Sequence, residues 1–417
     1  MKTSVGIEAL AVALPRRTLH LEDLARARGV DPAKYIGGLG VREMAVTDPG
    51  EDTVALAATA VRRLIDGNAV DPDSIGMLSV GTETGVDHSK PVASFVQGAV
   101  DLPRQMRVFD VQHACYGGTA ALMAAVEWIA SGVAGGKSAV VVCSDIARYG
   151  VKTAGEPTQG AGAVALLVSA RPELLAIDLG LNGTSSSHVF DFWRPLGRRE
   201  AVVDGHYSID CYLEALSGAY RDWRGKAEAK EIVRRNSAAL PSEQLAAVGY
   251  HVPFCKMAKK AHARLRRCDL DDLLGAFDEA REEREGATSF ERQVAPSLTL
   301  CSRVGNIYTG SLYLGLAGLL QAQAPALIGQ RIGLFSYGSG CTSEFFSGVV
   351  GRRAAEQIAA ANISELLAAR ERISITEYER IMALPSTAPL VPWPNPGGDG
   401  VFLFVGVTNH QRQYASR

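Results

Sequence analysis

Gln112-His113-Ala114-Cys115-Tyr116-Gly117-Gly118-Thr119-Ala120-Ala121-Leu122 is the stretch that decides the fold, because it brings one cysteine to the start of an apolar helix. Between Cys115 and Ile129 the only charged residue is Glu127, which predicts a buried helix. The partial positive charge at a helix N-terminus favours a thiolate, and a thiolate is a nucleophile for acyl groups. A cysteine that only packs a core helix is the common alternative. The interpretation of Cys115 therefore depends on its partners.

Composition indicates a globular enzyme and excludes several other classes. The 417 residues are 47% hydrophobic and 21% charged, enough for two domains or one two-lobed core. A net charge of −2 gives no sign of the excess positive charge that nucleic-acid binding proteins carry, and no apolar run reaches membrane-spanning length. Seven cysteines without paired short spacings argue against a disulfide framework and a Cys-rich zinc site, so we expect a reducing cytoplasm. Glu8 interrupts the apolar run 5–15, which reads as a buried strand rather than a signal peptide.

Short β-rich runs alternate with helical stretches, which predicts an α/β fold with buried sheets. The expected strands are 75–80, 139–143, 163–168, 331–336 and 401–407, and the expected helices between the first of them are 55–65 and 120–129. The two halves of the sequence share a pattern: residues 115–119 precede the apolar helix 120–129, and residues 306–311 precede an apolar helix at 312–320. Two similar halves facing each other would bring both helix starts to one centre.

Two other kinds of segment are expected at the surface. Residues 221–236 and 263–293 are dense in charge with helical periodicity, which is typical of solvated helices. Residues 385–398 hold five prolines and are expected to form a loop ahead of the last strand.

Four further features could supply partners for the thiol. Glu83 follows the expected strand 75–80, and His251 follows the apolar run 245–250. Asn306 opens the second apolar helix, where it could also be only a cap. The turn 337–340, Tyr-Gly-Ser-Gly, can point backbone N–H groups at an oxyanion. Together with Cys115 as the nucleophile, they provide the base, imidazole, amide and oxyanion site that carbon–carbon bond formation on thioesters needs.

The chain resembles the hydroxymethylglutaryl-CoA synthases, a family of the thiolase-fold superfamily, along nearly its whole length. The matching segments, in order, are Gly81-Thr82-Glu83-Thr84, His113-Ala114-Cys115-Tyr116-Gly117-Gly118-Thr119, Gly155-Glu156-Pro157-Thr158-Gln159-Gly160-Ala161-Gly162-Ala163, Asp191-Phe192-Trp193-Arg194-Pro195, His251-Val252-Pro253-Phe254, Gly305-Asn306-Ile307-Tyr308-Thr309-Gly310-Ser311 and Ser336-Tyr337-Gly338-Ser339-Gly340. The resemblance implies a homodimer with a five-layered αβαβα fold of two similar halves. Residues 1–170 would carry Glu83 and Cys115, and 171–417, with surface helical insertions, would carry His251, Asn306 and Ser339.

The resemblance also implies a role for each matching residue. Cys115 would be the nucleophile, Glu83 the general acid/base and His251 the residue that polarises the acceptor. The other implied positions are Ser339 at the oxyanion through its backbone N–H, Asn306, Tyr149 and Thr158 in the acyl pocket, Asp87, Asp145 and Asp191 as carboxylates that order the site, and Ser208, Lys256 and Lys260 near the phosphates of CoA. Lys256 and Lys260 share one face if 253–267 is helical, and Lys259 falls off that face.

The implied reaction condenses acetyl-CoA with acetoacetyl-CoA through an acetyl-Cys115 intermediate, giving 3-hydroxy-3-methylglutaryl-CoA and free CoA without a metal or redox cofactor. The product would enter mevalonate or isoprenoid metabolism. The same family contains polyketide enzymes that add acetyl from an acyl carrier protein to a β-ketoacyl carrier protein. Lys256 and Lys260 suit a phosphopantetheine phosphate or an acidic carrier protein equally well, so this alternative stays open.

Three other functions fit the residues less well. A ketoacyl synthase III-type enzyme also uses cysteine, histidine and asparagine in this order, but its decarboxylative condensation needs no base at Glu83. A thiolase needs a second catalytic cysteine, and Cys341 stands in the wrong context. A non-enzymatic carrier-binding module would have no reason to keep Glu83, Cys115 and His251 together.

Overall fold

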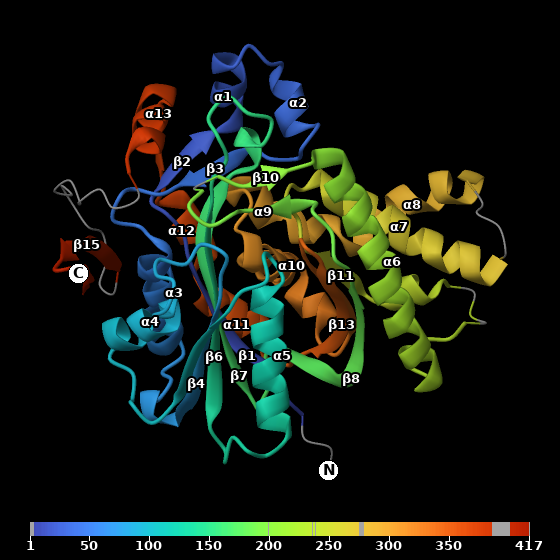
Figure 1. The fold of residues 1–417 in the computed structure, drawn as a ribbon. Helices are drawn as coiled ribbons and strands as arrows, with labels where there is room; N and C mark the ends of the chain where they lie inside the picture. Colours follow the sequence, from blue (N-terminus) through green and yellow to red (C-terminus); the bar gives the residue numbers. More distant parts are fainter. Residues whose placement is uncertain are drawn as a thin grey trace.

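A nine-stranded mixed sheet runs through the computed structural model, which describes residues 4–198, 200–235, 237, 239–274, 279–385 and 401–416 (Figure 1). In spatial order its strands are β11 (Ala247–Tyr250), β12 (Arg331–Gly338), β13 (Thr342–Val350), β8 (Leu175–Ser186), β1 (Gly6–Ala13), β7 (Gly160–Ser169), β6 (Ser138–Ala147), β4 (Ile75–Gly81) and β5 (Arg107–Val111). The strands expected from the sequence coincide with β1, β4, β6, β7, β12 and the later β15 (Phe402–Thr408).

The sheet is built from the same strand pattern twice. In the first half β4 runs parallel to β6, β6 antiparallel to β7, and β7 antiparallel to β1. In the second half β11 runs parallel to β12, β12 antiparallel to β13, and β13 antiparallel to β8. The two halves join where Gly6 of β1 pairs with Ala176 of β8. This repeat confirms the expected α/β fold of two similar halves, and it makes β4 and β11 corresponding strands.

Helices form the central and the outer layers of the αβαβα arrangement (Figure 1). The central layer holds α5 (Gly117–Ala130), which contacts β4 to β7, and α10 (Ser311–Leu327), which contacts β11 and β12. Thr119 of α5 and Tyr313 of α10 are hydrogen-bonded through their hydroxyls at 2.7 Å. On the outside, α3 (Thr53–Gly67) and α4 (Val92–Val100) cover the first half, and α6 (Gly205–Ala229) covers β8 and β13. The predicted helices 55–65, 120–129 and 312–320 are thereby confirmed.

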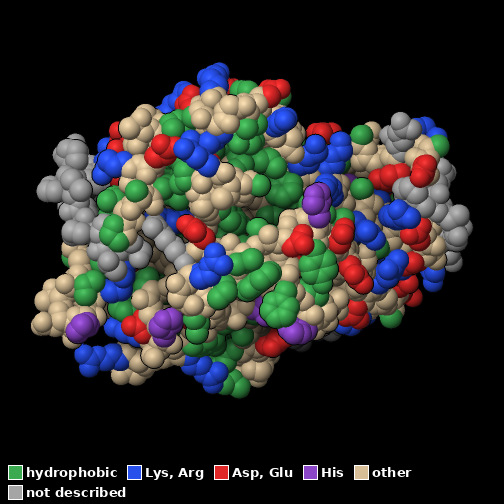
Figure 2. Space-filling model, turned by 45° about the horizontal axis from the view of Figure 1, so that its top comes forward, with side chains coloured by type: hydrophobic (Ala, Val, Ile, Leu, Met, Phe, Trp, Pro, Cys, Tyr) green, Lys and Arg blue, Asp and Glu red, His purple; other side chains and the backbone are tan. Residues whose placement is uncertain are grey.

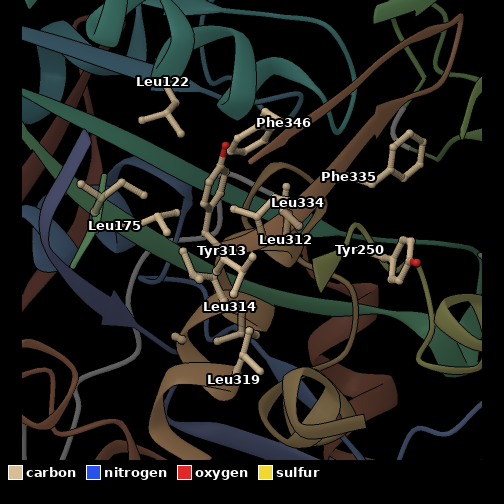
Figure 3. Close-up of a cluster of buried hydrophobic side chains, with 14 of the residues drawn as sticks. Leu122, Leu175, Tyr250, Leu312, Tyr313, Leu314, Leu319, Leu334, Phe335 and Phe346 are labelled. Carbon is tan, nitrogen blue, oxygen red and sulfur yellow. The ribbon is translucent and has the colours of Figure 1, made fainter. Parts of the chain in front are cut away.

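Two apolar cores occupy the two faces of the first half-sheet. Leu10 and Val12 of β1 belong to the core around α5 and α10, whereas Ala9, Ala11 and Ala13 face the core beneath α3. Figure 3 shows the first core, where Leu122 of α5, the leucines of α10 and the strand residues Leu334 and Phe346 converge on Tyr313. A strand buried on both faces reads as a continuous apolar run, which is the pattern of 5–15.

The smaller elements surround this body. They are β2 (Arg17–His20), β3 (Glu43–Val46) and β14 (Glu371–Arg372) in a three-stranded sheet, the pair β9 (Phe192–Trp193) and β10 (Val202–Val203), the hairpin β15–β16 (Gln411–Ser416), and the helices α1 (Leu21–Ala27), α2 (Pro32–Ile36), α7 (Lys256–Leu274), α8 (Glu279–Gln293), α9 (Leu298–Val304), α11 (Ala354–Ala360), α12 (Ile363–Ala368) and α13 (Ile375–Ala383). The C-terminal hairpin packs on the first half, where Phe402 N donates to Thr59 Oγ1 of α3 at 3.0 Å. Of the loop expected at 385–398, all but Pro385 lies outside the described residues.

The expectation of solvated surface helices in the charge-dense segments is confirmed only in part, because not all of their charged side chains are exposed. α6 ends at Ala229, and 263–293 contains two helices, α7 and α8. Their charges are partly internal: Arg266 and Asp269 are fully buried, Arg266 Nε lies 2.7 Å from Glu282 Oε2, and a guanidinium nitrogen of Arg224 lies 2.9 Å from Asp269 Oδ1. Buried charges are tolerated when paired, so these ion pairs tie the helices together.

The distribution of surface charge is mixed, as the small net charge of the sequence suggests, and the cysteines are unpaired. Figure 2 shows basic and acidic side chains interspersed on the drawn face. All seven cysteines are free thiols. Within the described ranges, no helix combines the length and the apolar character that crossing a bilayer requires.

Candidate active site

Cys115 lies two residues before α5, in a turn that is packed tightly against the ends of β4 and β12. Tyr116 N donates to His113 O at 3.0 Å to close the turn. A Cβ on Gly81 would lie 2.4 Å from the Cα of Gly118, so only glycine lets the end of β4 approach the start of α5 this closely. This contact places the residues that follow β4 beside the thiol.

Glu83 is the hydrogen-bond partner of the thiol. The Sγ atom of Cys115 donates to Oε1 of Glu83 at 3.3 Å, and Glu83 is only 9% exposed. Burial, with a contribution from the charge of Asp145, raises the pKa of Glu83 to about 8, against the opposing effects of Arg194 and the Cys115 hydrogen bond. Glu83 can therefore exchange a proton near neutral pH, as a general base must.

The expectation of a resting thiolate at Cys115 is wrong. Burial, and then the negative charge and hydrogen bonding of Glu83, raise the pKa of the Cys115 thiol well above its usual range. The partial positive charge of the α5 N-terminus acts in the opposite direction. Cys115 as a residue is half-buried.

Asp145, on β6, joins the loop of Glu83 to the second half of the molecule. Its fully buried carboxylate accepts hydrogen bonds from Thr82 Oγ1 at 2.9 Å, from Glu83 N at 2.9 Å, and from Thr84 Oγ1 at 2.7 Å. It also accepts from Thr309 N at 3.1 Å, in the turn that opens α10. One carboxylate thus fixes the loop of Glu83 relative to the turn that opens α10.

Asp191 holds the turn that contains Ser339. The hydroxyl of Tyr337 donates to Asp191 Oδ2 at 2.6 Å, and Gly340 N donates to Oδ1 at 3.0 Å. A Cβ on Gly338 would lie 2.5 Å from His113 O, so the end of β12 rests directly on the turn of Cys115. Ser339, between these two glycines, therefore lies beside the nucleophile.

Asn306, Tyr149 and Thr158 come together near the thiol. Asn306 N donates to Thr158 O at 3.1 Å. Asn306 Oδ1 accepts from Tyr308 N and from Ser311 Oγ, both at 2.9 Å, so the side chain stabilises the turn before α10 and does not cap the helix, whose N-cap is Gly310. Burial, and then the charges of Cys115 and Glu83, raise the pKa of Tyr149, which places its ring near both groups.

His251 directly follows β11, in the position that corresponds to the end of β4 in the first half. It is 3% exposed, and its backbone is fixed by bonds from His251 N to Phe335 O at 2.8 Å and from the Tyr212 hydroxyl to His251 O at 2.7 Å. Burial lowers the pKa of His251 to about 3, so the imidazole is neutral at physiological pH. A neutral imidazole can donate one hydrogen bond to a carbonyl.

The remaining predicted residues lie farther out. Ser208 Oγ on α6 lies 3.4 Å from Asp191 Oδ2. Lys256 and Lys260 are exposed on α7, which begins at Lys256 rather than at Pro253, and Lys259 is exposed beside them. Asp87 is exposed and accepts from Ser89 N and Lys90 N, both at 2.8 Å, so these two bonds stabilise its own loop.

Sequence reasoning missed two contacts of the site. The guanidinium of Arg194 donates to the backbone carbonyl of Glu83, and its charge acts to lower the pKa of that carboxyl. The hydroxyl of Tyr116 donates to Glu344 Oε2 at 2.7 Å, which ties the residue after the nucleophile to β13. Arg194 is the one basic residue of the family segment 191–195, and this charge is the only feature of the sequence that pointed to a role near a carboxylate.

Comparisons with known proteins show the family of the chain. The family profile "Hydroxymethylglutaryl-coenzyme A synthase N terminal" matches residues 1–172, and its C-terminal counterpart matches 175–276 and 279–390. The hydroxymethylglutaryl-CoA synthase of Enterococcus faecalis is 35% identical over 91% of this chain and 92% of its own, and the mitochondrial enzyme of Homo sapiens is 34% identical over 99% and 89%.

Solved structures show the same likeness. MvaS in complex with 3-hydroxy-3-methylglutaryl coenzyme A is 67% identical, with a TM-score of 0.96 over 100% of both chains. The HMG synthase of the curacin biosynthetic pathway is 33% identical, with a TM-score of 0.87 over 99% of this chain and 100% of that one.

Proposed function

The chain belongs to the hydroxymethylglutaryl-CoA synthase family, and from this premise we propose that Cys115, Glu83 and His251 carry the family's condensation. The enzyme joins acetyl-CoA to acetoacetyl-CoA and yields 3-hydroxy-3-methylglutaryl-CoA and free CoA. The observation that supports these roles best is the 3.3 Å contact between Cys115 Sγ and Glu83 Oε1, because it puts a base within reach of whatever the sulfur carries.

The first step moves acetyl from CoA to Cys115. The sulfur of Cys115 attacks the thioester carbon, the bond from that carbon to the CoA sulfur breaks, and the net proton transfer is from one thiol to the other. The backbone N–H of Ser339 stabilises the oxyanion, since its turn lies against the turn of Cys115. Asp191 fixes this turn through Gly340 N.

The second step forms the carbon–carbon bond. Glu83 takes a proton from the acetyl methyl group, and the carbanion attacks C3 of acetoacetyl-CoA. His251 stabilises the negative oxygen that develops there, since its neutral imidazole can donate to it. The proton on Glu83 then completes the tertiary alcohol.

In the third step, water cleaves the thioester to Cys115 and releases the product. None of the three steps involves a net oxidation or reduction, so we propose that the enzyme uses no redox cofactor. We also propose that it uses no metal, since Glu83, His251 and the N–H of Ser339 take the proton-transfer and oxyanion roles.

CoA is the carrier we propose. The 67% identical MvaS structure holds a CoA product, and exposed Lys256 and Lys260 can bind phosphate. A carrier-protein substrate is the second candidate, because the curacin HMG synthase, 32% identical, is known in complex with an acetyl donor carrier protein. The lower identity makes CoA the better supported choice, and with it a place in mevalonate rather than polyketide metabolism.

We also propose a homodimer and a cytoplasmic location. β5 is an edge strand that pairs with β4 alone among the described strands, and its residues 108–111 are neither buried nor fully exposed. Such an edge is suited to pair with a second copy. Light scattering of the purified protein tests the dimer, and a monomer at working concentration would contradict it.

The free thiols support a reducing compartment, as the proposed cytoplasmic location requires.

Intact-mass measurement tests the proposed chemistry. Incubation with acetyl-CoA alone should add one acetyl group to the wild type and none to Cys115→Ala. Subsequent acetoacetyl-CoA should discharge the acetyl group as 3-hydroxy-3-methylglutaryl-CoA. An acetyl group on the Ala variant would remove Cys115 from the mechanism. The same assay with carrier-protein substrates, if they react much faster than the CoA thioesters, would transfer the proposal to the second candidate.

A further inference from the structure

A cavity of about 580 Å³ reaches Glu83 from the side of the molecule that carries α3, α13 and the C-terminal hairpin. Its described walls include the loop 82–88, the segment 194–198 and Arg412 of β16. Ser208, Lys256 and Lys260 belong to α6 and α7, which Figure 1 draws on the other side of the central helices. The cavity is therefore a second approach to the site, separate from the proposed CoA phosphate residues.

Glu83 forms the wall between this cavity and the nucleophile. Glu83 lines the cavity, and its Oε1 lies 3.3 Å from Cys115 Sγ. Cys115 and His251 are not among the lining residues. Asp110, Arg148 and Arg194 make the lining polar, and a polar space of this size is far above the about 10–15 Å³ that one water molecule needs.

The third step of the reaction creates a demand that this cavity meets. Before hydrolysis, the new acyl group is bound to Cys115 at one end and to CoA at the other. The CoA arm then still occupies the path by which the substrates arrived. Water that attacks the Cys115 thioester must reach it by another path.

We propose that this cavity is the water path for the hydrolytic step, with Glu83 at its inner end. The inference rests on the proposed function. A water molecule at Glu83 attacks the thioester carbon, and the bond between that carbon and Sγ breaks. Glu83 accepts the proton of the water and passes it to Sγ, so that the products are a free carboxyl group and the Cys115 thiol.

The wild-type enzyme tests the water path directly. Cys115 is first acetylated with acetyl-CoA, and desulfo-CoA, which lacks the reactive sulfur, is then added to saturation. Hydroxylamine is the probe, because it is a nucleophile of nearly the size of water. We expect hydroxylamine to remove the acetyl group at a similar rate with and without desulfo-CoA, as followed by intact mass. Protection of acetyl-Cys115 by desulfo-CoA would overturn the water path. Failure of the proposed function is distinguishable, because Cys115 would then not be acetylated at all.

A variant pair tests the cavity itself. A Cβ on Gly85 would meet only Asp87 O, at 3.9 Å, and Gly85 lines the cavity, so Gly85→Trp can place a ring in it. Gly225→Trp is the matched control, since a Cβ there meets nothing within 4 Å and Gly225 lies on the exposed face of α6. With desulfo-CoA bound, Gly85→Trp should slow deacetylation by about tenfold, a barrier change of ~1.4 kcal/mol, while Gly225→Trp stays at the wild-type rate. Equal rates in both variants would contradict the proposal.

Discussion

The Sγ atom of Cys115 lies 3.3 Å from Oε1 of Glu83, and the two groups act on each other in opposite directions. The carboxylate raises the pKa of the thiol, whereas the hydrogen bond from the thiol lowers the pKa of the carboxyl. Acetylation of Cys115 removes that donor. Glu83 therefore becomes a stronger base at the moment when a methyl proton has to be removed.

Condensation should increase as the pH rises through neutrality. Glu83 acts as a base only when ionised. Its pKa is raised to about 8 in the free enzyme, and loss of the Cys115 hydrogen bond on acetylation raises it further, so the active fraction keeps growing through that pH. The pH dependence of kcat/KM for acetoacetyl-CoA, measured with pre-acetylated enzyme, should show this ascending limb. A profile that is already flat below neutral pH would place the base elsewhere.

Arg194 should affect the pH at which this ascending limb lies. Its guanidinium donates to Glu83 O and its charge opposes the raised pKa, so Arg194→Met should move the ascending limb upward by on the order of one pH unit. Arg194→Lys keeps the charge and should restore most of the wild-type profile. If both variants lose activity without any displacement of the limb, Arg194 has only a structural role.

His251→Ala should separate the two halves of the reaction. Acetylation of Cys115 should proceed, while condensation should decrease by about 10²–10⁴-fold, the range expected for a positioned proton donor. Intact mass measures the first step and product formation the second. Loss of acetylation with normal binding of acetoacetyl-CoA would assign His251 to the nucleophile instead.

Lys256 and Lys260 should matter for CoA thioesters and not for short mimics. If they bind phosphate, each lost charge-assisted bond costs about 1.5–3 kcal/mol, so the double Ala variant should raise KM for acetoacetyl-CoA with little change in kcat. Lys259→Ala is the matched control, because it is exposed on the same helix. A KM that responds equally to Lys259→Ala would show a general charge effect.

Most of the fold was predictable because both halves follow simple periodicities. β4 and β12 are continuous apolar runs that end in glycine-containing turns, and α5 carries a single charge. Those strand ends position Glu83 and Ser339, so the main site residues could be located from the sequence. The charged helices were predicted, but the burial of Arg266 was not, because it depends on Glu243 and Glu282, two partners from different segments.

The electrostatics of the site were not predictable in the same way. The protonated state of Cys115 follows from its depth and from Glu83, 32 positions away in the sequence. Arg194 reaches Glu83 O across 111 positions, from an irregular segment without a periodic pattern. A local pattern identifies a helix start, but a pKa depends on every charge that the fold brings near it.

Exchange of the acetyl methyl protons with deuterated water is the most direct test of the central claim that Glu83 removes a methyl proton from acetyl-Cys115. Glu83→Gln should still form acetyl-Cys115, because loss of the carboxylate lowers the pKa of the thiol rather than raising it. The account predicts that wild-type acetyl-enzyme takes up deuterium and that Glu83→Gln does not, with condensation reduced by at least about 10²-fold. Deuterium uptake or undiminished condensation in Glu83→Gln would contradict it.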